Sequence, residues 1–267
     1  MNDLRRELAP IPDEAWAILE EEVTRTLKAA LSVRKIADFK GPHGWGYSAV
    51  NLGRTRTAES TLVEGLQTRI RMVLPLVELK AEFELLRDDI DCASRGARDL
   101  DVQPAIDAAL RLASAEDKLA YYGYAPAGIR GICESSPHPA LSLPPDPAAY
   151  PQVIAEARER LRDGGIHGPY ALALDSPSHT ALSKTTVSGF PVLLHVRRLL
   201  SGRVIWAPAL DGALLLSLRG GDFEMTVGRD VSIGYLDHDA HKVRLYLEES
   251  VTFQVLTPEA AITLKRP

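Results

Sequence analysis

The sequence predicts a protein of the α+β class, with two long helices, an extended arm, a compact α/β insertion and closing strands. Three observations indicate this class. Two long stretches of helical periodicity lie in the first half of the 267-residue chain, a run of alternating polar and apolar residues lies between them, and short apolar runs separated by turns fill the last third. No segment recurs at a fixed period, which argues against a solenoid or a propeller.

The composition indicates an ordinary globular protein, 45% hydrophobic and 25% charged. The net charge is −5 and the basic residues form no cluster, so we expect no nucleic-acid partner, which would require concentrated Lys and Arg. The first residues lack the apolar centre of a signal peptide, and no apolar run is long enough to span a membrane. Two distant cysteines, Cys92 and Cys133, suit a reducing compartment. We therefore expect a cytoplasmic protein.

The first helix is predicted after Pro12, with Asp13 as a candidate N-cap. Apolar residues then recur at helical spacing opposite a charged face. They are Trp16, Leu19, Val23, Leu27, Ala30 and Leu31. Such a stripe must be covered, and in most proteins the chain's own core covers it. A turn-rich segment with two aromatic residues follows at 41–47.

An extended arm is predicted next, because residues 47–66 are mostly polar and residues 66–85 alternate. Beyond Pro75 the alternation changes phase, so that the apolar residues from Val77 to Leu85 face one way and the charged residues between them face the other. A proline at the phase change fits a bend in an edge strand. The arm has too little apolar surface to be stable alone, so we expect it to need a neighbour.

The longest helical pattern runs from Asp101, a candidate cap, to Tyr124. Residues 134–150 are rich in proline and predict a loop. Helices and strands then alternate, and further strands close the fold. The predicted helices are 152–163, 176–183 and 191–200, and the predicted strands are 170–175, 204–207, 213–218, 223–227, 231–235, 243–247 and 251–257.

The sharpest candidate for chemistry is the segment from Asp237 to His241, which contains two imidazoles and two carboxylates. Such groups bind divalent metals, so a soluble metal-dependent enzyme is one hypothesis. The segment lies between two predicted strands, however, where a hairpin needs polar residues in any case. The glycines of Gly220–Asp222 lack the spacing of a phosphate-binding loop, and no nucleophile, base and orienting group come together. We therefore expect no metal, no cofactor and no enzyme activity.

Several short motifs occur in a specific order along the chain. They are Leu8-Ala9-Pro10-Ile11, Gly41-Pro42-His43-Gly44-Trp45, Leu74-Pro75-Leu76-Val77-Glu78-Leu79, Ala125-Pro126-Ala127-Gly128-Ile129-Arg130-Gly131-Ile132, Gly168-Pro169-Tyr170, Arg219-Gly220-Gly221-Asp222-Phe223, Val231-Ser232-Ile233-Gly234-Tyr235, Val243-Arg244-Leu245-Tyr246, and Phe253-Gln254-Val255 with Pro258-Glu259-Ala260. Each motif alone is weak, but the ordered set is specific. Together they resemble the type 1 encapsulin shell proteins, the linocin-like family, up to about Leu264.

The resemblance implies the fold of tailed-phage major capsid proteins, in which a subunit has a peripheral domain, an extended loop and an axial domain. The implied boundaries are 1–46, 77–133 and 219–267 for the peripheral domain, 47–76 for the extended loop and 134–218 for the axial domain. About sixty copies of such a subunit close an icosahedral shell. By this resemblance the chain is a self-assembling, homo-oligomeric shell subunit of an encapsulin nanocompartment.

Encapsulins enclose cargo enzymes, commonly a dye-decolourising peroxidase or a ferritin-like iron oxidase, which carry a short carboxyl-terminal docking peptide. By resemblance, the residues that bind this peptide are Leu27, Ala30, Leu31, Arg34, Ile36, Asp38, Val251 and Phe253. A small-oligomer peptide-binding module using the same groove is the remaining alternative.

Two further expectations follow from the resemblance. The first concerns a pore at the five-fold axis, for which an ordinary exposed loop is the alternative. The residues that would line it are Lys184, Thr185, Thr186, Val187, Ser188 and Gly189. The second concerns flavin, which some relatives bind through an aromatic residue at the position that Asp88 occupies here. The carboxylate at this position argues against flavin binding.

Overall fold

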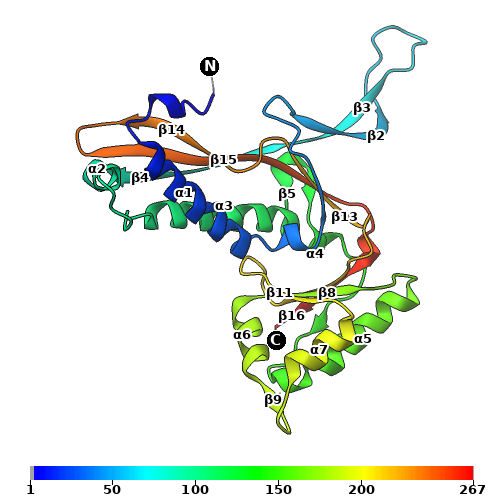
Figure 1. Cartoon of the computed structure of the whole chain (residues 1–267). Helices are drawn as coiled ribbons and strands as arrows, with labels where there is room; N and C mark the ends of the chain where they lie inside the picture. The colour runs from blue at the N-terminus through cyan, green and yellow to red at the C-terminus, as the bar shows by residue number, and fades with distance from the viewer. Residues whose placement is uncertain (1–2, 267) are drawn as a thin grey trace.

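The structure, a computed structural model, describes residues 3–266, which form two five-stranded sheets and a projecting arm (Figure 1). The helices are α1 (Asp13–Ala30), α2 (Arg87–Ser94), α3 (Gln103–Tyr122), α4 (Ile132–Ser135), α5 (Tyr150–Asp163), α6 (Ser176–Lys184) and α7 (Val192–Leu200). Short 3-10 helices are η1 (Arg6–Leu8), η2 (Val33–Lys35), η3 (Ala125–Ala127), η4 (Pro147–Ala149) and η5 (Pro258–Ala260).

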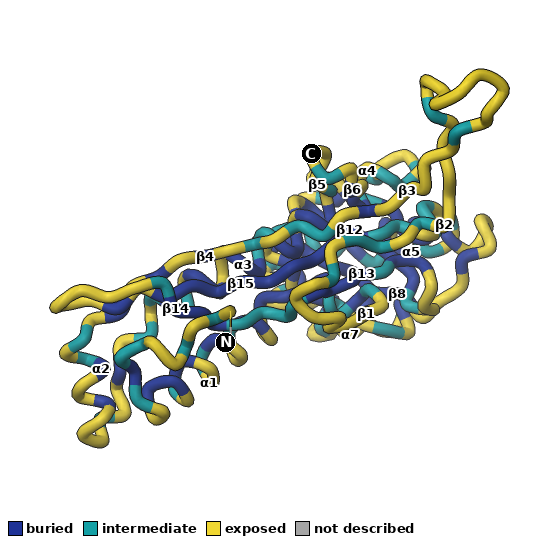
Figure 2. Tube along the Cα trace, turned by 90° about the horizontal axis from the view of Figure 1, so that it is seen from above, coloured by how far each residue is buried: buried dark blue, intermediate teal, exposed yellow. Residues whose placement is uncertain are grey.

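In the first sheet, β15 (Lys242–Val255) pairs with β4 (Val77–Leu86) along one edge. Its other edge pairs with β14 (Ser232–His238) and then with β13 (Phe223–Val227), which continues to β1 (Asp38–Lys40). Figure 2 shows β15 as an almost continuous buried strand through the middle of this half of the molecule. Helices α1 and α3 pack against each other, and α3 covers β4 and β15.

The second sheet has the order β11 (Arg203–Trp206), β8 (Tyr170–Leu174), β12 (Ala213–Ser217), β16 (Ala261–Lys265) and β7 (Leu141–Ser142). Every residue of β8 and β12 is buried, as expected for central strands that are covered on both faces. Helices α5 and α7 pack together below this sheet in Figure 1. Two small hairpins complete the strands, β5 (Gly123–Tyr124) with β6 (Ile129–Arg130) and β9 (Thr186–Val187) with β10 (Phe190–Pro191).

The arm consists of β2 (Ala49–Thr57) and β3 (Arg69–Pro75), which pair antiparallel and project away from both sheets (Figure 1). The predicted bend is confirmed, because β3 ends at Pro75 and β4 begins at Val77. The predicted alternation is confirmed too: Ala81 and Phe83 are buried, whereas the charged residues between the apolar ones are exposed. At the tip of the arm, Leu62 is 84% exposed.

The two ends of the predicted first helix differ in their outcome. Helix α1 ends at Ala30, one residue before the last residue of the predicted apolar stripe. At the other end, Asp13 is not the N-cap: Pro12 takes that position, and Asp13 lies in the first turn and caps nothing. A carboxylate there still interacts favourably with the helix dipole. In α3 the predicted cap Asp101 is likewise not the N-cap, which is Val102. Its carboxylate lies one residue earlier, where Oδ1 accepts a hydrogen bond from the N–H of Gln103 at 3.0 Å.

Two strands predicted at 243–247 and 251–257 are in fact the single strand β15. The polar residues that suggested a break are buried and paired: Glu248 with Arg229, and Glu249 with Arg34. The structure also contains α2 and β16, which the sequence did not predict. Because β16 pairs with β12 and β7, residues 261–265 lie in the second sheet, although the expected boundaries grouped them with the peripheral domain.

Within residues 3–266, none of the helices is both long enough and apolar enough to cross a membrane.

Candidate functional site

The carboxyl-terminal half of α1 forms one wall of a groove with a volume of about 420 Å³. The residues that line it come from α1, from η2 and from the turn before β14. They are Thr24, Leu27, Lys28, Leu31, Arg34, Lys35, Asp230 and Val231. Leu27 and Leu31 lie one helical turn apart and are also part of the core between α1 and the sheet. The apolar stripe of α1 is therefore shared between the core and the groove.

The floor of the groove is an ion-pair cluster around Arg34. Its Nη2 atom lies 2.6 Å from Glu116 Oε2 and 2.9 Å from Glu249 Oε2, and its Nη1 atom lies 2.7 Å from Asp230 Oδ1. The side chains of Glu116 and Glu249 are fully buried, whereas that of Arg34 is 19% exposed. The guanidinium thus connects α3, β15 and the turn before β14 at the base of the groove.

The cluster contains more carboxyl groups than Arg34 can neutralise. Burial, and then the nearby charge of Glu116, raise the pKa of Glu249 well above its ordinary value of 4.5. Burial alone would lower the pKa of Arg34, but its hydrogen bonds and charge interactions with the three carboxylates outweigh that effect and raise it. Glu249 therefore retains a proton more readily than an ordinary glutamate does.

Asp117 holds the segment that carries Arg34 and Lys35. Its carboxylate accepts hydrogen bonds from the backbone N–H groups of Ser32 and Val33, each at 3.0 Å, and from the Ser32 hydroxyl. Burial raises the pKa of Asp117 to about 6, although these hydrogen bonds favour the charged form. Through these contacts, α3 positions η2 at the end of the groove.

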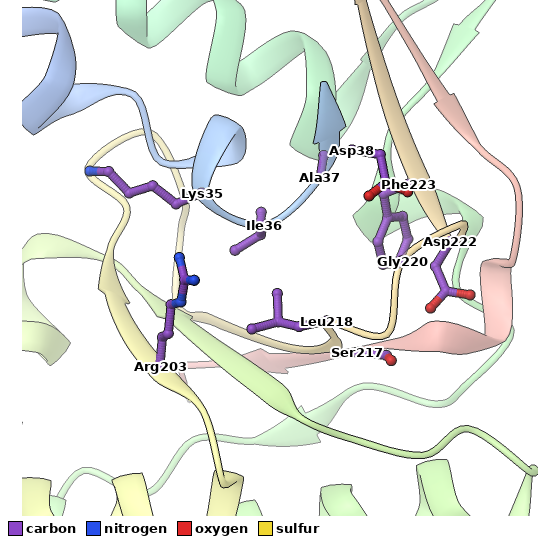
Figure 3. Close-up of a pocket in the computed structure, with 10 residues that line it drawn as sticks. All are labelled: Lys35, Ile36, Ala37, Asp38, Arg203, Ser217, Leu218, Gly220, Asp222 and Phe223. Carbon is purple, nitrogen blue, oxygen red and sulfur yellow. The ribbon is translucent and has the colours of Figure 1, made fainter. Parts of the chain in front are cut away.

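The structure separates the residues expected to bind a peptide into three groups. Leu27, Leu31 and Arg34 line the groove. Ile36 and Asp38 line a neighbouring cavity of about 180 Å³ together with Phe223, and Asp38 lies beside Phe223 (Figure 3).

The third group consists of Ala30, Val251 and Phe253, which are buried in the core and line none of these cavities. The two strand residues face inward, as their alternation in β15 requires.

Sequence reasoning missed five of the residues that line the groove. Two of them, Thr24 and Lys28, could have been found, because they flank Leu27 and Leu31 at helical spacing. Asp230 and Val231 lie two hundred positions away along the chain, and no local pattern connects them to α1. Lys35 gave no signal either, because its place depends on the hydrogen bonds of Asp117.

The segment expected to line a pore is a tight hairpin. Lys184 ends α6, and Thr186 and Val187 pair with Pro191 and Phe190. Ser188 and Gly189 form the two-residue turn with φ angles of 49° and 78°, and such left-handed conformations favour glycine. Figure 1 shows this hairpin as a projection from the end of the second half of the molecule.

Asp237 and His238 end β14, and the residues from Asp239 to His241 form the hairpin turn to β15. Asp239 Oδ1 accepts hydrogen bonds from the backbone N–H groups of His241 and Lys242, at 2.7 and 2.8 Å. Asp237 pairs with Arg244, and His238 Nδ1 lies 2.5 Å from the Tyr235 hydroxyl. These side chains therefore have local structural partners. Among residues 3–266, no three His, Cys, Asp or Glu side chains are grouped as metal ligands.

Asp88, at the position linked to flavin binding in some relatives, lies exposed in the first turn of α2. A carboxylate at this position interacts favourably with the amino-terminal end of the helix dipole.

The solved structures that this chain is similar to are capsid-like particles. The virus-like particle of Pyrococcus furiosus aligns with a TM-score of 0.67 at 16% identity, over 93% of this chain and 98% of that one. The capsid of the phage XM1 aligns with a TM-score of 0.57 at 12% identity, over 90% of this chain and 92% of that one. The expected capsid fold is confirmed.

The sequence comparisons agree. The family model described as "Encapsulating protein for peroxidase" matches residues 1–252. A type 1 encapsulin shell protein of Rhodospirillum rubrum is 52% identical over 99% of this chain and 97% of its own length. Those of Rhodococcus erythropolis and Mycobacterium tuberculosis are 45% and 43% identical, over 99% of this chain and 100% and 99% of their own lengths. The chain therefore belongs to the linocin-like family of type 1 encapsulin shell proteins.

Proposed function

We propose that this chain is the subunit of a closed icosahedral shell of about sixty copies, which assembles in the cytoplasm and encloses a cargo enzyme. The family of the chain and its capsid fold support the role of a self-assembling, homo-oligomeric shell protein. The number of copies, the compartment and the cargo are the parts that we add. In this function the chain itself performs no catalysis.

The arm is the observation that carries this proposal. Its tip exposes three apolar side chains, Leu62, Val63 and Leu66, which are 84%, 65% and 51% exposed. Exposed apolar residues that are grouped in this way indicate a protein interface. The two-stranded ribbon also has no sheet of its own to join, since β2 and β3 pair only with each other among residues 3–266. We infer that the arm is covered by another copy of the chain.

The two halves of the fold support an assignment of the domains. We assign the half built on α1, α3 and β15 to the peripheral domain, the arm at 47–76 to the extended loop, and the half built on β8, α5 and α7 to the axial domain. In this assignment β16 crosses from the peripheral to the axial part, since it pairs with β12. The hairpin at 184–191 then lies at the tip of the axial domain, where we propose that it surrounds the five-fold axis.

The groove beside α1 is the site that we propose for the cargo peptide. Its apolar part, at Leu27 and Leu31, suits apolar side chains of an extended peptide, and the charged groups at its rim suit polar contacts with the peptide backbone. The ion-pair cluster of Arg34 fixes the floor, so the groove exists before the peptide binds.

Assembly is tested by the mass and shape of the purified protein. We expect size-exclusion chromatography and electron microscopy to show uniform hollow particles of megadalton mass, because about sixty copies of a 29.2 kDa chain are combined. A protein that remains a monomer, dimer or tetramer at micromolar concentration would contradict the shell function.

Cargo binding is tested by replacing Lys28 with glutamate. Lys28 lines the groove without contributing to the core, so the change reverses a charge at the rim and leaves the subunit fold intact. We expect the variant shells to form normally but to retain less of a co-expressed cargo protein, chosen from the reading frame beside the gene. The measurement is the ratio of cargo to shell protein in purified particles.

The matched control is Arg25→Glu, three residues earlier on the same helix. Arg25 does not line the groove, and its exposed side chain pairs with Glu22 on the same helix. If both variants lose cargo equally, or if Lys28→Glu loads as well as the wild type, the groove is not the binding site.

A further inference from the structure

Next to the groove lies a cavity of about 460 Å³ that is lined by three cationic residues. Lys35 comes from η2, Arg197 from α7 and Arg203 from β11. Figure 3 shows Arg203 extending from β11 toward the segment that carries Lys35. Lys35 also lines the groove and the cavity of Figure 3, so the three hollows meet at this side chain.

None of the described residues that line this cavity is acidic. Among residues 3–266, none of the three cations forms an ion pair, and the Lys35 ammonium donates instead to the carbonyl oxygen of Ala29 at 2.9 Å. The carboxyl-terminal end of a helix attracts cations, which accounts for Arg197. It does not account for Lys35 and Arg203, which come from other elements. An anion in this cavity would interact favourably with all three of these residues.

The charge of Arg197 also reaches a neighbouring imidazole. Burial, and then the charge of Arg197, lower the pKa of His179 below its ordinary value of 6.5. Burial also lowers the pKa of Lys35, and the charge of Asp117 opposes this only in part. The cause for Lys35 is therefore burial, and of the two groups only His179 responds to the charge of an arginine that lines this cavity.

Backbone donors are directed to the same place. Strand β11 is an edge strand that pairs with β8 alone. On the β8 side, the N–H of Ala207 donates to the carbonyl oxygen of Leu174 at 2.8 Å. Because N–H groups alternate in direction along a strand, those of Val204 and Trp206 point away from β8, to the open edge that the cavity flanks.

We propose that this cavity binds an oxyanion of the phosphate class. The planar forks of Arg197 and Arg203 match the geometry of phosphate oxygens, Lys35 adds a third charge, and the backbone N–H groups of β11 complete the donors. Lys35 belongs to the half of the subunit built on the first sheet, and the two arginines belong to the other half. A bound phosphate therefore ties the two halves together.

Two sources share this chemistry: free inorganic phosphate, and the phosphate groups of a nucleotide. Trp206 also lines the cavity, and its ring is partly exposed and held by a hydrogen bond from Nε1 to the Ser176 hydroxyl at 2.9 Å. An aromatic face beside phosphate-binding cations suits the base of a nucleotide. The cavity volume is in the range of small-molecule sites.

The test is isothermal titration of the assembled protein with inorganic phosphate, at constant ionic strength and without other multivalent anions. We expect saturable binding to the wild type, a loss of affinity of about tenfold or more in Arg203→Gln, and recovery of part of it in Arg203→Lys. The matched control is Arg198→Gln. Arg198 follows Arg197 in α7, but it does not line the cavity, and its guanidinium lies over the ring of Phe190. This control should bind phosphate as the wild type does.

A parallel titration with ADP distinguishes the two sources. If a nucleotide is the ligand, ADP binds more tightly than phosphate, and Trp206→Leu weakens ADP without changing phosphate. If free phosphate is the ligand, ADP binds no more tightly than phosphate, and Trp206→Leu leaves the affinity for ADP unchanged.

Three outcomes would overturn the proposal. The first is no saturable binding of phosphate at millimolar concentrations, and the second is an equal loss of phosphate affinity in Arg198→Gln and Arg203→Gln. The third is that titration with sodium chloride releases the same heat as titration with phosphate. Electron microscopy of each variant confirms that a change in binding does not come from failed assembly.

Discussion

Replacing Arg34 by methionine is expected to lower the free energy of unfolding by about 3–5 kcal/mol at neutral pH. The reason is the burial of its partners: the side chains of Glu116 and Glu249 have no exposed surface and lose their cation in this variant. Methionine has a similar length, so the loss reports the missing charge more than a missing volume. The measurement is the midpoint of denaturant unfolding, at one fixed protein concentration because the subunits are assembled.

The pH dependence gives this prediction a second readout. Without Arg34, Glu249 loses the charge that opposes its protonation, so its carboxyl group binds a proton more readily in the native state than in the unfolded state. Its contribution to the stability of the variant is then fully present below the ordinary glutamate pKa and falls as the pH rises, and the defect relative to the wild type shrinks on acidification. In the wild type, the raised pKa of Glu249 likewise gives a contribution to stability that falls as the pH rises.

The control is Arg25→Met on α1, where the Arg25 side chain is 73% exposed and pairs with Glu22. Its effect should stay within about 0.5 kcal/mol. Adding Glu116→Gln and Glu249→Gln to Arg34→Met should restore part of the lost stability, because no buried charge is then left alone. An Arg34→Met protein as stable as the wild type at pH 7 would contradict the role of the cluster.

Shortening the arm is expected to abolish closed shells. Residues 58–68 connect β2 to β3, and an Asn-Gly turn in their place leaves the ribbon closed at Thr57 and Arg69, which already pair. The lost segment contains Leu62, Val63 and Leu66, and burying such side chains contributes about 1.5–3 kcal/mol each in every subunit of a shell. We expect soluble small oligomers in electron microscopy and analytical ultracentrifugation.

A point variant separates the apolar contacts from the length of the arm. Leu62→Ser with Val63→Ser should impair assembly, whereas Glu59→Gln with Glu64→Gln at the same tip should not. Circular dichroism should remain unchanged in all of these proteins, since the tip lies outside both cores. Normal particles from the shortened arm would show that assembly does not depend on this contact.

The parts of the fold that follow a single local period could be predicted from the sequence. The apolar stripe of α1, the length of α3 and the alternation of β4 are of this kind, because each side chain's environment repeats along one element. Strand β15 could not be recognised as continuous. Its central acidic residues are buried only because Arg34 and Arg229 meet them from distant parts of the chain.

The groove shows the same limit. Leu27 and Leu31 belong to a periodic stripe and could be proposed, but the opposite wall at Asp230 arises from tertiary structure. The resemblance named Val251 and Phe253 as neighbours of the groove, and they do lie in the sheet under this region, but with their side chains in the core. The position of a residue along a strand does not show on which face of the sheet a groove lies.

The continuity of the arm with the sheet has a mechanical consequence. The chain leaves β3 at Pro75 and enters β4 at Val77, which pairs with β15 along its whole length up to Leu86. Hydrogen bonds between antiparallel strands lie across the strands, so tension along β4 strains all of them together in shear instead of opening them one after another. An outward pressure that pulls on the arm is therefore resisted by the entire sheet, and the weak point under load lies in the contact between neighbouring subunits.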